Sequence, residues 1–208
     1  MTANYGYLGS GNTVSLLRHN GQTGAAAAFL APVNYAAGDA PLRLAAADLN
    51  GDSRLDLAVG HIQAANSAIS VPVSILLNGG SGNFAAPSNY ESAPGARLFT
   101  AAVAFGDLDN DGDADLISGG LYPSGSVDNG AIIVRRNNGA GVFGNHEIYS
   151  FPNFVAHPQK LTTADITGDG FADILAAAPT GRSTDGWILL KSNGAGGFLP
   201  AVRYEAAQ

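Results

Sequence analysis

The chain has 208 residues, 46% of them hydrophobic and 13% charged, so it is long enough for one or two packed domains and too apolar for general disorder. Acidic residues outnumber basic ones by 17 to 10, and a net charge of −7 with only two lysines argues against nucleic acid as a partner. Cysteine is absent, which excludes disulfides and thiolate sites, and no apolar run is long enough to span a membrane.

Three landmarks recur in constant order along the chain. An Asp-rich segment begins at Asp48, and similar segments begin 59 and 58 residues further on, at Asp107 and Asp165. A Phe followed six residues later by a Tyr occurs four times, each time preceded by an Asn-Gly pair, and this recurrence predicts a tandem array of one supersecondary unit. The pairs are Phe29/Tyr35, Phe84/Tyr90, Phe143/Tyr149 and Phe198/Tyr204, preceded by Asn20-Gly21, Asn78-Gly79, Asn138-Gly139 and Asn193-Gly194.

Each full repeat predicts four short strands. A small apolar strand leads into the Asp-rich segment, a second strand follows directly, and a third is rich in Val, Ile and Leu. The fourth carries the Phe and the Tyr, which share one face of that strand if no bulge intervenes. Four antiparallel strands repeated in tandem are typical of β-propeller blades, so the expected fold is all-β. The first three strands are expected at 42–47, 55–60 and 71–77, at 98–105, 114–119 and 131–135, and at 161–164, 172–177 and 187–191.

The phase of the repeats predicts about three and a half blades. Residues 1–40 form a partial blade of outer strands, with a further strand near 4–8, and full blades follow at 41–96, 97–159 and 160–208. Closed propellers have four to eight blades, so we expect the chain to be part of a larger ring or assembly. A longer parent chain, head-to-tail self-association or strands donated by a partner would each complete it.

The Asp-rich segments predict Ca²⁺ sites. Oxygen side chains stand at positions 1, 3, 5 and 9 of each loop, 48–56, 107–115 and 165–173, and a main-chain carbonyl at position 7 adds a ligand. About three ions per chain are expected, and these would neutralise most of the net charge. The expected ligands are Asp48, Asn50, Asp52, Arg54, Asp56, Asp107, Asp109, Asp111, Asp113, Asp115, Asp165, Thr167, Asp169, Phe171 and Asp173.

Two other interpretations of these loops are less consistent with the sequence. An EF-hand requires a bidentate Glu at position 12, where this chain has Val59, Ser118 and Ala176. Ordinary Asp/Gly turns without metal would leave the clustered carboxylates to repel one another. By carboxylate count, the Asp107 loop binds most tightly and the Asp165 loop, with Thr167, most weakly.

Residues 105–112, Phe-Gly-Asp-Leu-Asp-Asn-Asp-Gly, followed by Asp115-Leu116, resemble the FG-GAP/VCBS repeat. That family forms the propeller heads of integrin alpha chains and of many surface proteins and lectins. The resemblance implies Ca²⁺ with a structural role in the hairpin between the first two strands of a blade. Two departures are Ser53 in place of the loop glycine and Thr167 in place of an acid.

No catalytic constellation is apparent, and we expect no enzyme. The histidines at 19, 61, 146 and 157 are scattered without partners at metal-ligand or triad spacing. Residues 139–144 match the dinucleotide fingerprint Gly-x-Gly-x-x-Gly, but they lie in the recurring turn and no helix follows.

The expected function is therefore binding. Loops on the side opposite the acidic loops vary most, and variable loops on a rigid scaffold commonly carry recognition. We expect an extracellular or cell-surface adhesion module for a glycan or protein ligand, although no signal peptide is visible; the alternative is a structural repeat that assembles head-to-tail into a ring, stalk or filament. The candidate ligand-binding residues are Tyr122, Asp128, Asn129, Arg182, Asp185 and Trp187, each of which could also be an ordinary exposed residue.

Overall fold

In a computed structural model, fifteen β-strands make up the regular structure of the described part of the chain. The structure describes residues 2–4, 11–24, 28–61, 73–91, 102–124, 127–151, 158–178 and 186–205. These residues contain no α-helix, and therefore no helix long and apolar enough to cross a membrane. The all-β prediction is confirmed.

The strands form four antiparallel sheets that follow one another along the chain. In each sheet, strands adjacent in sequence are adjacent in space, which is the meander of a propeller blade. The first sheet contains β1 (Thr2–Asn4), β2 (Thr13–Leu16) and β3 (Val33–Ala36), and the second contains β4 (Pro41–Ala47), β5 (Asp56–His61), β6 (Val73–Leu76) and β7 (Ser88–Tyr90). The third contains β8 (Ala102–Gly106), β9 (Asp115–Ser124), β10 (Val127–Asn137) and β11 (Phe143–Ser150), and the fourth contains β12 (Lys160–Ala164), β13 (Asp173–Ala178), β14 (Gly186–Leu190) and β15 (Val202–Glu205).

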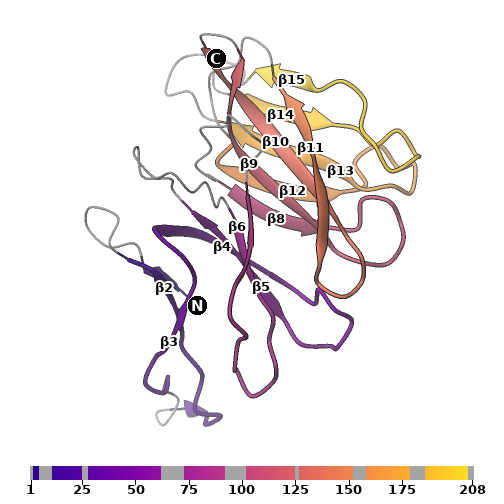
Figure 1. Ribbon diagram of the computed structural model, residues 1–208. Coiled ribbons are helices and arrows are strands. Elements are labelled where there is room, and N and C mark those ends of the chain that lie inside the picture. Colours follow the sequence, from indigo (N-terminus) through magenta and orange to yellow (C-terminus); the bar gives the residue numbers. More distant parts are fainter. Residues whose placement is uncertain are drawn as a thin grey trace.

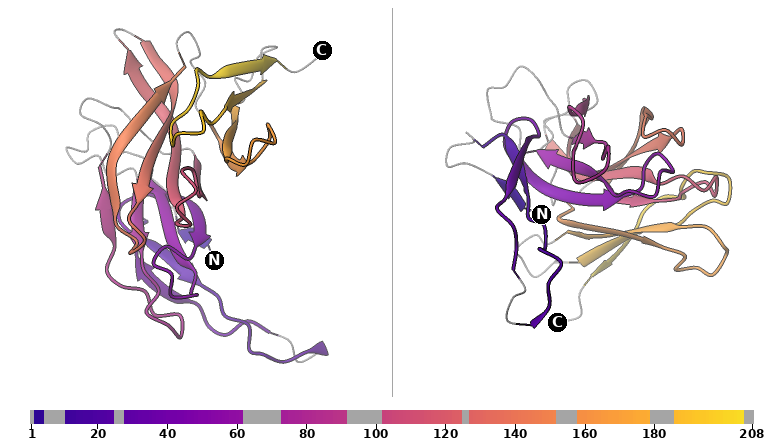
Figure 2. Two further views of the ribbon diagram at one scale, coloured as in Figure 1. Left: turned by 90° about the vertical axis from the view of Figure 1, so that its right-hand side faces the viewer. Right: turned by 90° about the horizontal axis from the view of Figure 1, so that it is seen from below.

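The sheets lie side by side in chain order, so that the molecule is a partial propeller (Figures 1 and 2). Its hydrophobic core is divided into three clusters, and each cluster fills the space between two successive sheets. Val14 of the first sheet packs with Leu57 and Val59 of the second, and Ile132 of the third packs with Ile174 of the fourth. The second and third sheets therefore depend on their neighbours to bury both of their faces.

An extra residue in the fourth strand changes the expected placement of the Phe/Tyr pairs. In the third sheet Tyr149 pairs with Ile132 and Phe143 pairs with Asn137, so six residues on β11 match five on β10. The other three sheets have the same offset. Such a bulge turns the Phe and the Tyr to opposite faces of the strand.

As a result, each Tyr packs against the Phe of the next sheet. The ring centroids lie 5.2 Å apart for Tyr35 and Phe84, 5.5 Å for Tyr90 and Phe143, and 5.3 Å for Tyr149 and Phe198, all edge to face. The two aromatic residues of one strand thus tie their sheet to the sheets on either side.

Most strand positions agree with the sequence prediction. The partial first blade has its innermost described strand at Thr2–Asn4, ahead of the expected segment near 4–8, of which residues 5–8 lie outside the described residues. Strands β9 and β10 are longer than expected and pair from Val127↔Ser124 to Arg135↔Leu116. This hairpin extends past the other sheets on the side away from the Asp107 loop (Figure 1).

Candidate calcium sites

The three acidic loops each join the first and second strands of a sheet, as predicted. At position 6 the backbone enters the left-handed region, with φ of 64° at Ser53, 93° at Gly112 and 87° at Gly170. Glycine adopts this conformation without strain, whereas a side chain such as that of Ser53 makes it less favourable. A sharp bend therefore lies at position 6 in all three loops.

The aspartate at position 9 of each loop is fully buried and fastens the loop to the sheet. Asp56 accepts hydrogen bonds from the backbone N–H groups of Leu49 at 3.0 Å and Asn78 at 2.6 Å. Leu49 lies at loop position 2, and Asn78 follows the third strand of the sheet. The same bonds are made by Asp115, with Leu108 and Asn137, and by Asp173, with Ile166 and Ser192.

The Asp107 loop brings three carboxylates together. One oxygen from each of Asp107, Asp109 and Asp111 lies within 4.8 Å of the others. The Oδ1 atoms of Asp107 and Asp109 are buried and accept no hydrogen bond, whereas Asp107 Oδ2 accepts one from the Gly112 N–H at 3.0 Å. Buried carboxylate oxygens without a partner are costly, and a hard cation with oxygen ligands would satisfy them. The donor set therefore fits Ca²⁺.

Arg136 supports this loop from the end of β10. It donates to Asp115 Oδ2 at 2.7 Å, lies 3.6 Å from Glu147, and bonds the Gly196 carbonyl of the fourth sheet. Burial acts to lower the pKa of Arg136, but the hydrogen bond and charge of Asp115 raise it overall. Burial is the largest influence on Asp115 and raises its pKa against the bonds from Asn137 and Arg136. Arg136 thus forms its ion pairs with Asp115 at position 9 and with Glu147, and it acts on Asp109 of the three-carboxylate cluster only through its charge.

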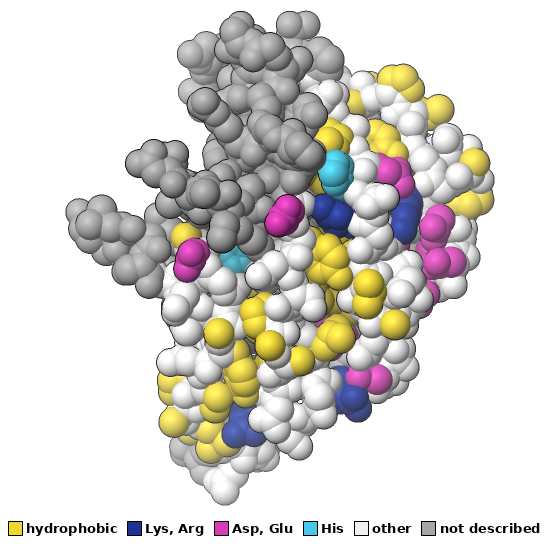
Figure 3. Space-filling view, in the orientation of Figure 1, with side chains coloured by type: hydrophobic (Ala, Val, Ile, Leu, Met, Phe, Trp, Pro, Cys, Tyr) yellow, Lys and Arg dark blue, Asp and Glu magenta, His cyan; other side chains and the backbone are white. Residues whose placement is uncertain are grey.

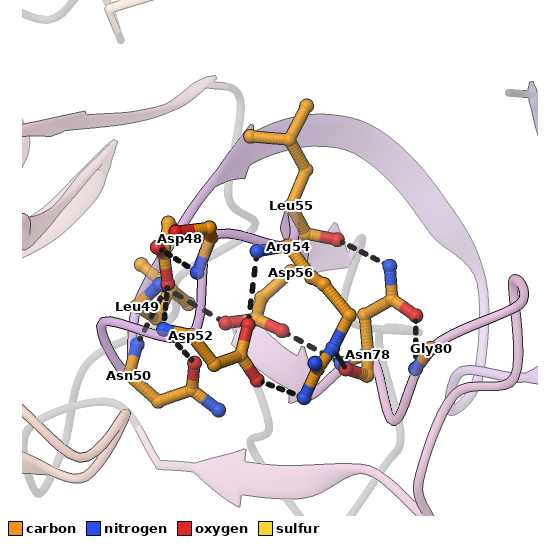
Figure 4. Close-up of polar contacts among 10 residues, drawn as sticks. Asp48, Leu49, Asn50, Asp52, Arg54, Leu55, Asp56, Asn78 and Gly80 are labelled. Carbon is orange, nitrogen blue, oxygen red and sulfur yellow. Dashed lines mark hydrogen bonds and ion pairs between the residues drawn. The ribbon is translucent and has the colours of Figure 1, made fainter.

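In the Asp48 loop, backbone N–H groups and an arginine of the loop itself provide hydrogen bonds and a counter-charge for its acids (Figure 4). Asp48 accepts backbone bonds from Asn50, Asp52 and Ser53. Burial acts to raise the pKa of Asp48, but these hydrogen bonds together hold it below its ordinary 3.8, and the bond from Ser53 contributes most among them. Asp52 forms an ion pair with Arg54 at 2.5 Å, so that one of the loop's charges already has a counter-charge.

The Asp165 loop is exposed from position 1 to position 6. Asp165 accepts backbone bonds from Gly168, Asp169 and Gly170, and Asp169 accepts one from Phe171. Asn110 of the preceding loop donates to the Gly170 carbonyl at 3.0 Å. With Thr167 at position 3, this loop has one acid fewer than the Asp107 loop in its first five positions.

The candidate ligand-binding residues do not form one described cluster. Tyr122 and Asn129 are cross-strand partners in the long β9–β10 hairpin, and Asp128 pairs with Pro123 beside them. The Asn129 side chain is buried. Trp187 stacks on Tyr204 with ring centroids 3.9 Å apart, and Arg182 and Asp185 lie outside the described residues.

Sequence reasoning missed the parts played by the two arginines. Arg54 was expected to contribute only its carbonyl, and Arg136 was not singled out. Within the part of the chain that the structure describes, only the cluster of Asp107, Asp109 and Asp111 has the geometry of a three-acid metal site. A basic residue at position 7 of the first loop was the available signal, because it can reach an acid of its own loop.

Comparisons with known proteins agree with the fold and with two of the loops. Residues 64–118 match the FG-GAP-like repeat family, and residues 157–196 match the FG-GAP repeat family. A search of curated proteins finds no match. The matched segments contain the Asp107 loop and the Asp165 loop, each between the first two strands of a four-stranded sheet. Two segments of the chain therefore match FG-GAP repeats, which are β-propeller blades.

Proposed function

We propose that this chain is a calcium-stabilised, non-catalytic propeller module that serves in extracellular binding or adhesion. The observation that carries the calcium part is the pair of buried, unpartnered oxygens, Asp107 Oδ1 and Asp109 Oδ1, beside Asp111. FG-GAP repeats commonly bind calcium, which supports the same proposal.

In the Asp107 loop, the carboxylates of Asp107, Asp109 and Asp111 would hold the ion, with the main-chain carbonyl of Asp113 as a further ligand. The ion would supply the positive charge that these acids lack. Its role would be structural, because the loop connects β8 to β9 and contacts the fourth sheet through Asn110. Loops 48–56 and 165–173 are proposed as weaker sites.

The binding surface is proposed on the opposite side of the blades. The β9–β10 hairpin, which carries Tyr122, Asp128 and Asn129, extends furthest there. In this proposal Tyr122 and Asp128 would contact a glycan or protein ligand, as in a lectin-like or integrin-like module. An extracellular or cell-surface location is proposed because FG-GAP repeats usually occur in extracellular proteins.

Thermal unfolding of the full chain in Ca²⁺ and in chelator tests the calcium proposal. A ligand at 100 times its dissociation constant stabilises the folded state by about 2.7 kcal/mol, or roughly 5–10 °C for a domain of this size. Asp109→Asn should remove most of the calcium-dependent shift, and Asp52→Asn, in the loop with its own cation, should retain it. An equal melting temperature with and without Ca²⁺ would refute the proposal.

Binding of the full chain to a glycan array in Ca²⁺ tests the ligand part separately. We expect a specific glycan signal that Tyr122→Ala reduces at least tenfold while the melting temperature stays the same. No glycan signal, together with capture of a protein from the cell surface, would assign the surface to a protein ligand.

A further inference from the structure

The contacts between successive sheets repeat with constant register, which defines two faces for every sheet. The forward face, toward the next sheet, carries the Tyr and the residue paired with it across the sheet, as in Tyr35 with Val14. The backward face, toward the preceding sheet, carries the Phe, as in Phe84. In all three internal interfaces a forward face packs on a backward face.

The forward face of the fourth sheet is exposed around Trp187 and Ile166, whereas Leu189 on the same face is buried. Trp187 pairs with Tyr204, as Val14, Val73 and Ile132 pair with the other tyrosines. Those three residues are at most 2% exposed, whereas Trp187 is 38% exposed. Ile166, at position 2 of its loop, is 46% exposed, whereas its counterparts Leu49 and Leu108 are buried.

The backward face of the first sheet is exposed in the same way. Phe29 is 67% exposed, whereas its counterpart Phe143 is 5% exposed under Tyr90. Leu17 is 38% exposed, and its counterparts Leu76 and Leu190 are fully buried. The space-filling view shows hydrophobic side chains on both end sheets, at the lower left and upper right (Figure 3).

Polar contacts across the internal interfaces follow the same register. Arg18 donates to the Ser81 carbonyl and Arg136 to the Gly196 carbonyl, in each case in the turn before the next sheet's Phe. Lys191 occupies this register in the fourth sheet. The forward face of the fourth sheet therefore has both the aromatic group found in every sheet and the cation that receives such a turn in the first and third sheets, where the second sheet has Leu77.

We propose that the forward face of the fourth sheet binds the backward face of the first sheet of a second copy of this chain. Tyr204 and Trp187 would receive Phe29 of the second copy, and Lys191 would reach the turn that precedes it. The occupant is a second copy because the two exposed faces have the chemistry of the two sides of every internal interface. The contact is heterologous, so repetition gives a ring or a filament.

Sedimentation of the full chain over a concentration series, in Ca²⁺, tests this pairing. The wild type should form assemblies larger than one chain. Phe29→Asp and Tyr204→Asp should each be monomeric alone, because each loses one of the two faces. An equimolar mixture of these two variants should recover a dimer through the remaining intact pair of faces, at least tenfold above either variant alone.

Val142→Asp and Leu55→Asp are matched controls, because both replace exposed hydrophobic residues away from the two end faces. They should assemble like the wild type, and all variants should keep the wild-type melting temperature within a few degrees. A monomeric wild type, or a mixture that stays monomeric, would overturn the pairing and leave the end faces to a different partner. The melting shift on chelation is read separately, so failure of the calcium proposal is distinguishable from failure of this one.

Discussion

The Asp107 loop and the Asp48 loop have the same length, each joins the first and second strands of its sheet, and each has a buried aspartate at position 9. Their charges are nevertheless balanced differently. In the Asp48 loop, Arg54 pairs with Asp52 and backbone N–H groups surround Asp48. In the Asp107 loop the nearby cation, Arg136, pairs with Asp115, and two buried oxygens remain without partners.

The proposed preference of Ca²⁺ for the Asp107 loop therefore has two grounds, the number of acids in the loop and the position of the nearest basic side chain. An arginine inside the loop supplies the positive charge that an ion would otherwise provide. An arginine outside the loop, as in the third sheet, pairs with the buried aspartate at position 9 and leaves the carboxylates of Asp107, Asp109 and Asp111 available to an ion.

The largest expected difference between the two loops is at position 9. Asp115→Ala would leave two backbone N–H groups without their acceptor and Arg136 without its buried carboxylate, and breaking such a pair costs about 3–5 kcal/mol. Asp56→Ala removes backbone acceptors only, at about 1–3 kcal/mol. Chemical denaturation measures both, and an equal loss would contradict the role given to Arg136.

A smaller difference is expected at the residue before each loop. Gly106 precedes the Asp107 loop, and a Cβ atom there would lie 2.6 Å from Oγ1 and 2.8 Å from Cγ2 of Thr163 in the fourth sheet. Ala47 stands at the corresponding place before the Asp48 loop. Gly106→Ala should therefore cost about 1–3 kcal/mol of unfolding free energy through overpacking.

Thr163→Ala is the control for that substitution, because it removes side-chain atoms that the added methyl group at position 106 would meet and loses only the bond to the Phe105 carbonyl. The double variant should be more stable than the sum of the single effects predicts, as measured in a double-mutant cycle. Simple additivity would show that the close approach of the two sheets is not the cause.

Changing the Asp48 loop toward the Asp107 loop should create a second tight site. Asn50→Asp supplies a third acid, and Arg54→Gln removes the cation that pairs with Asp52. The double variant should bind one more Ca²⁺ ion tightly than the wild type, with Arg54→Gln alone giving a smaller gain. Direct calcium titration measures the number of ions, and no gain in the double variant would show that another feature limits this loop.

The smallest expected effect is a loss of stability at acidic pH, which must be distinguished from the effect of calcium release when the loops are compared. Burial lowers the pKa of His61, against a smaller opposite effect of Asp39, and its ring bonds the Asp39 carbonyl and Ser74. Because the folded state holds this histidine neutral, its contribution to stability is complete above pH 6.5 and falls as the pH drops through the lower folded pKa. His61→Gln should flatten this pH dependence in Ca²⁺ and in chelator alike.

Much of the architecture could be predicted from the sequence because it depends on local patterns. The recurring Asp-rich segments, the apolar strands and the Asn-Gly turns lie within single repeats, and they predicted the four-stranded sheets and the left-handed bend at Gly112 and Gly170. Contacts between repeats were harder to predict. The spacing of Phe143 and Tyr149 places them on one face of an ideal strand, but the bulge in β11 sends them to opposite neighbours.

The charge balance of the loops could not be predicted from the sequence either, because it depends on which groups the long arginine side chains contact. Arg136 follows Arg135 directly, yet Arg136 bonds Asp115 whereas Arg135 lies over the Tyr90 ring of the preceding sheet. Alternation along β10 puts the two on opposite faces, but only the packed structure shows which acid or ring each one meets.

Isothermal titration of Ca²⁺ into the metal-free full chain tests the central claim most directly. The account predicts one tight site per chain that Asp109→Asn abolishes and Asp52→Asn leaves within about twofold of the wild-type affinity, with any further ions bound more weakly. A tight site that survives Asp109→Asn, or one that both substitutions weaken equally, would contradict the distinction between the two loops.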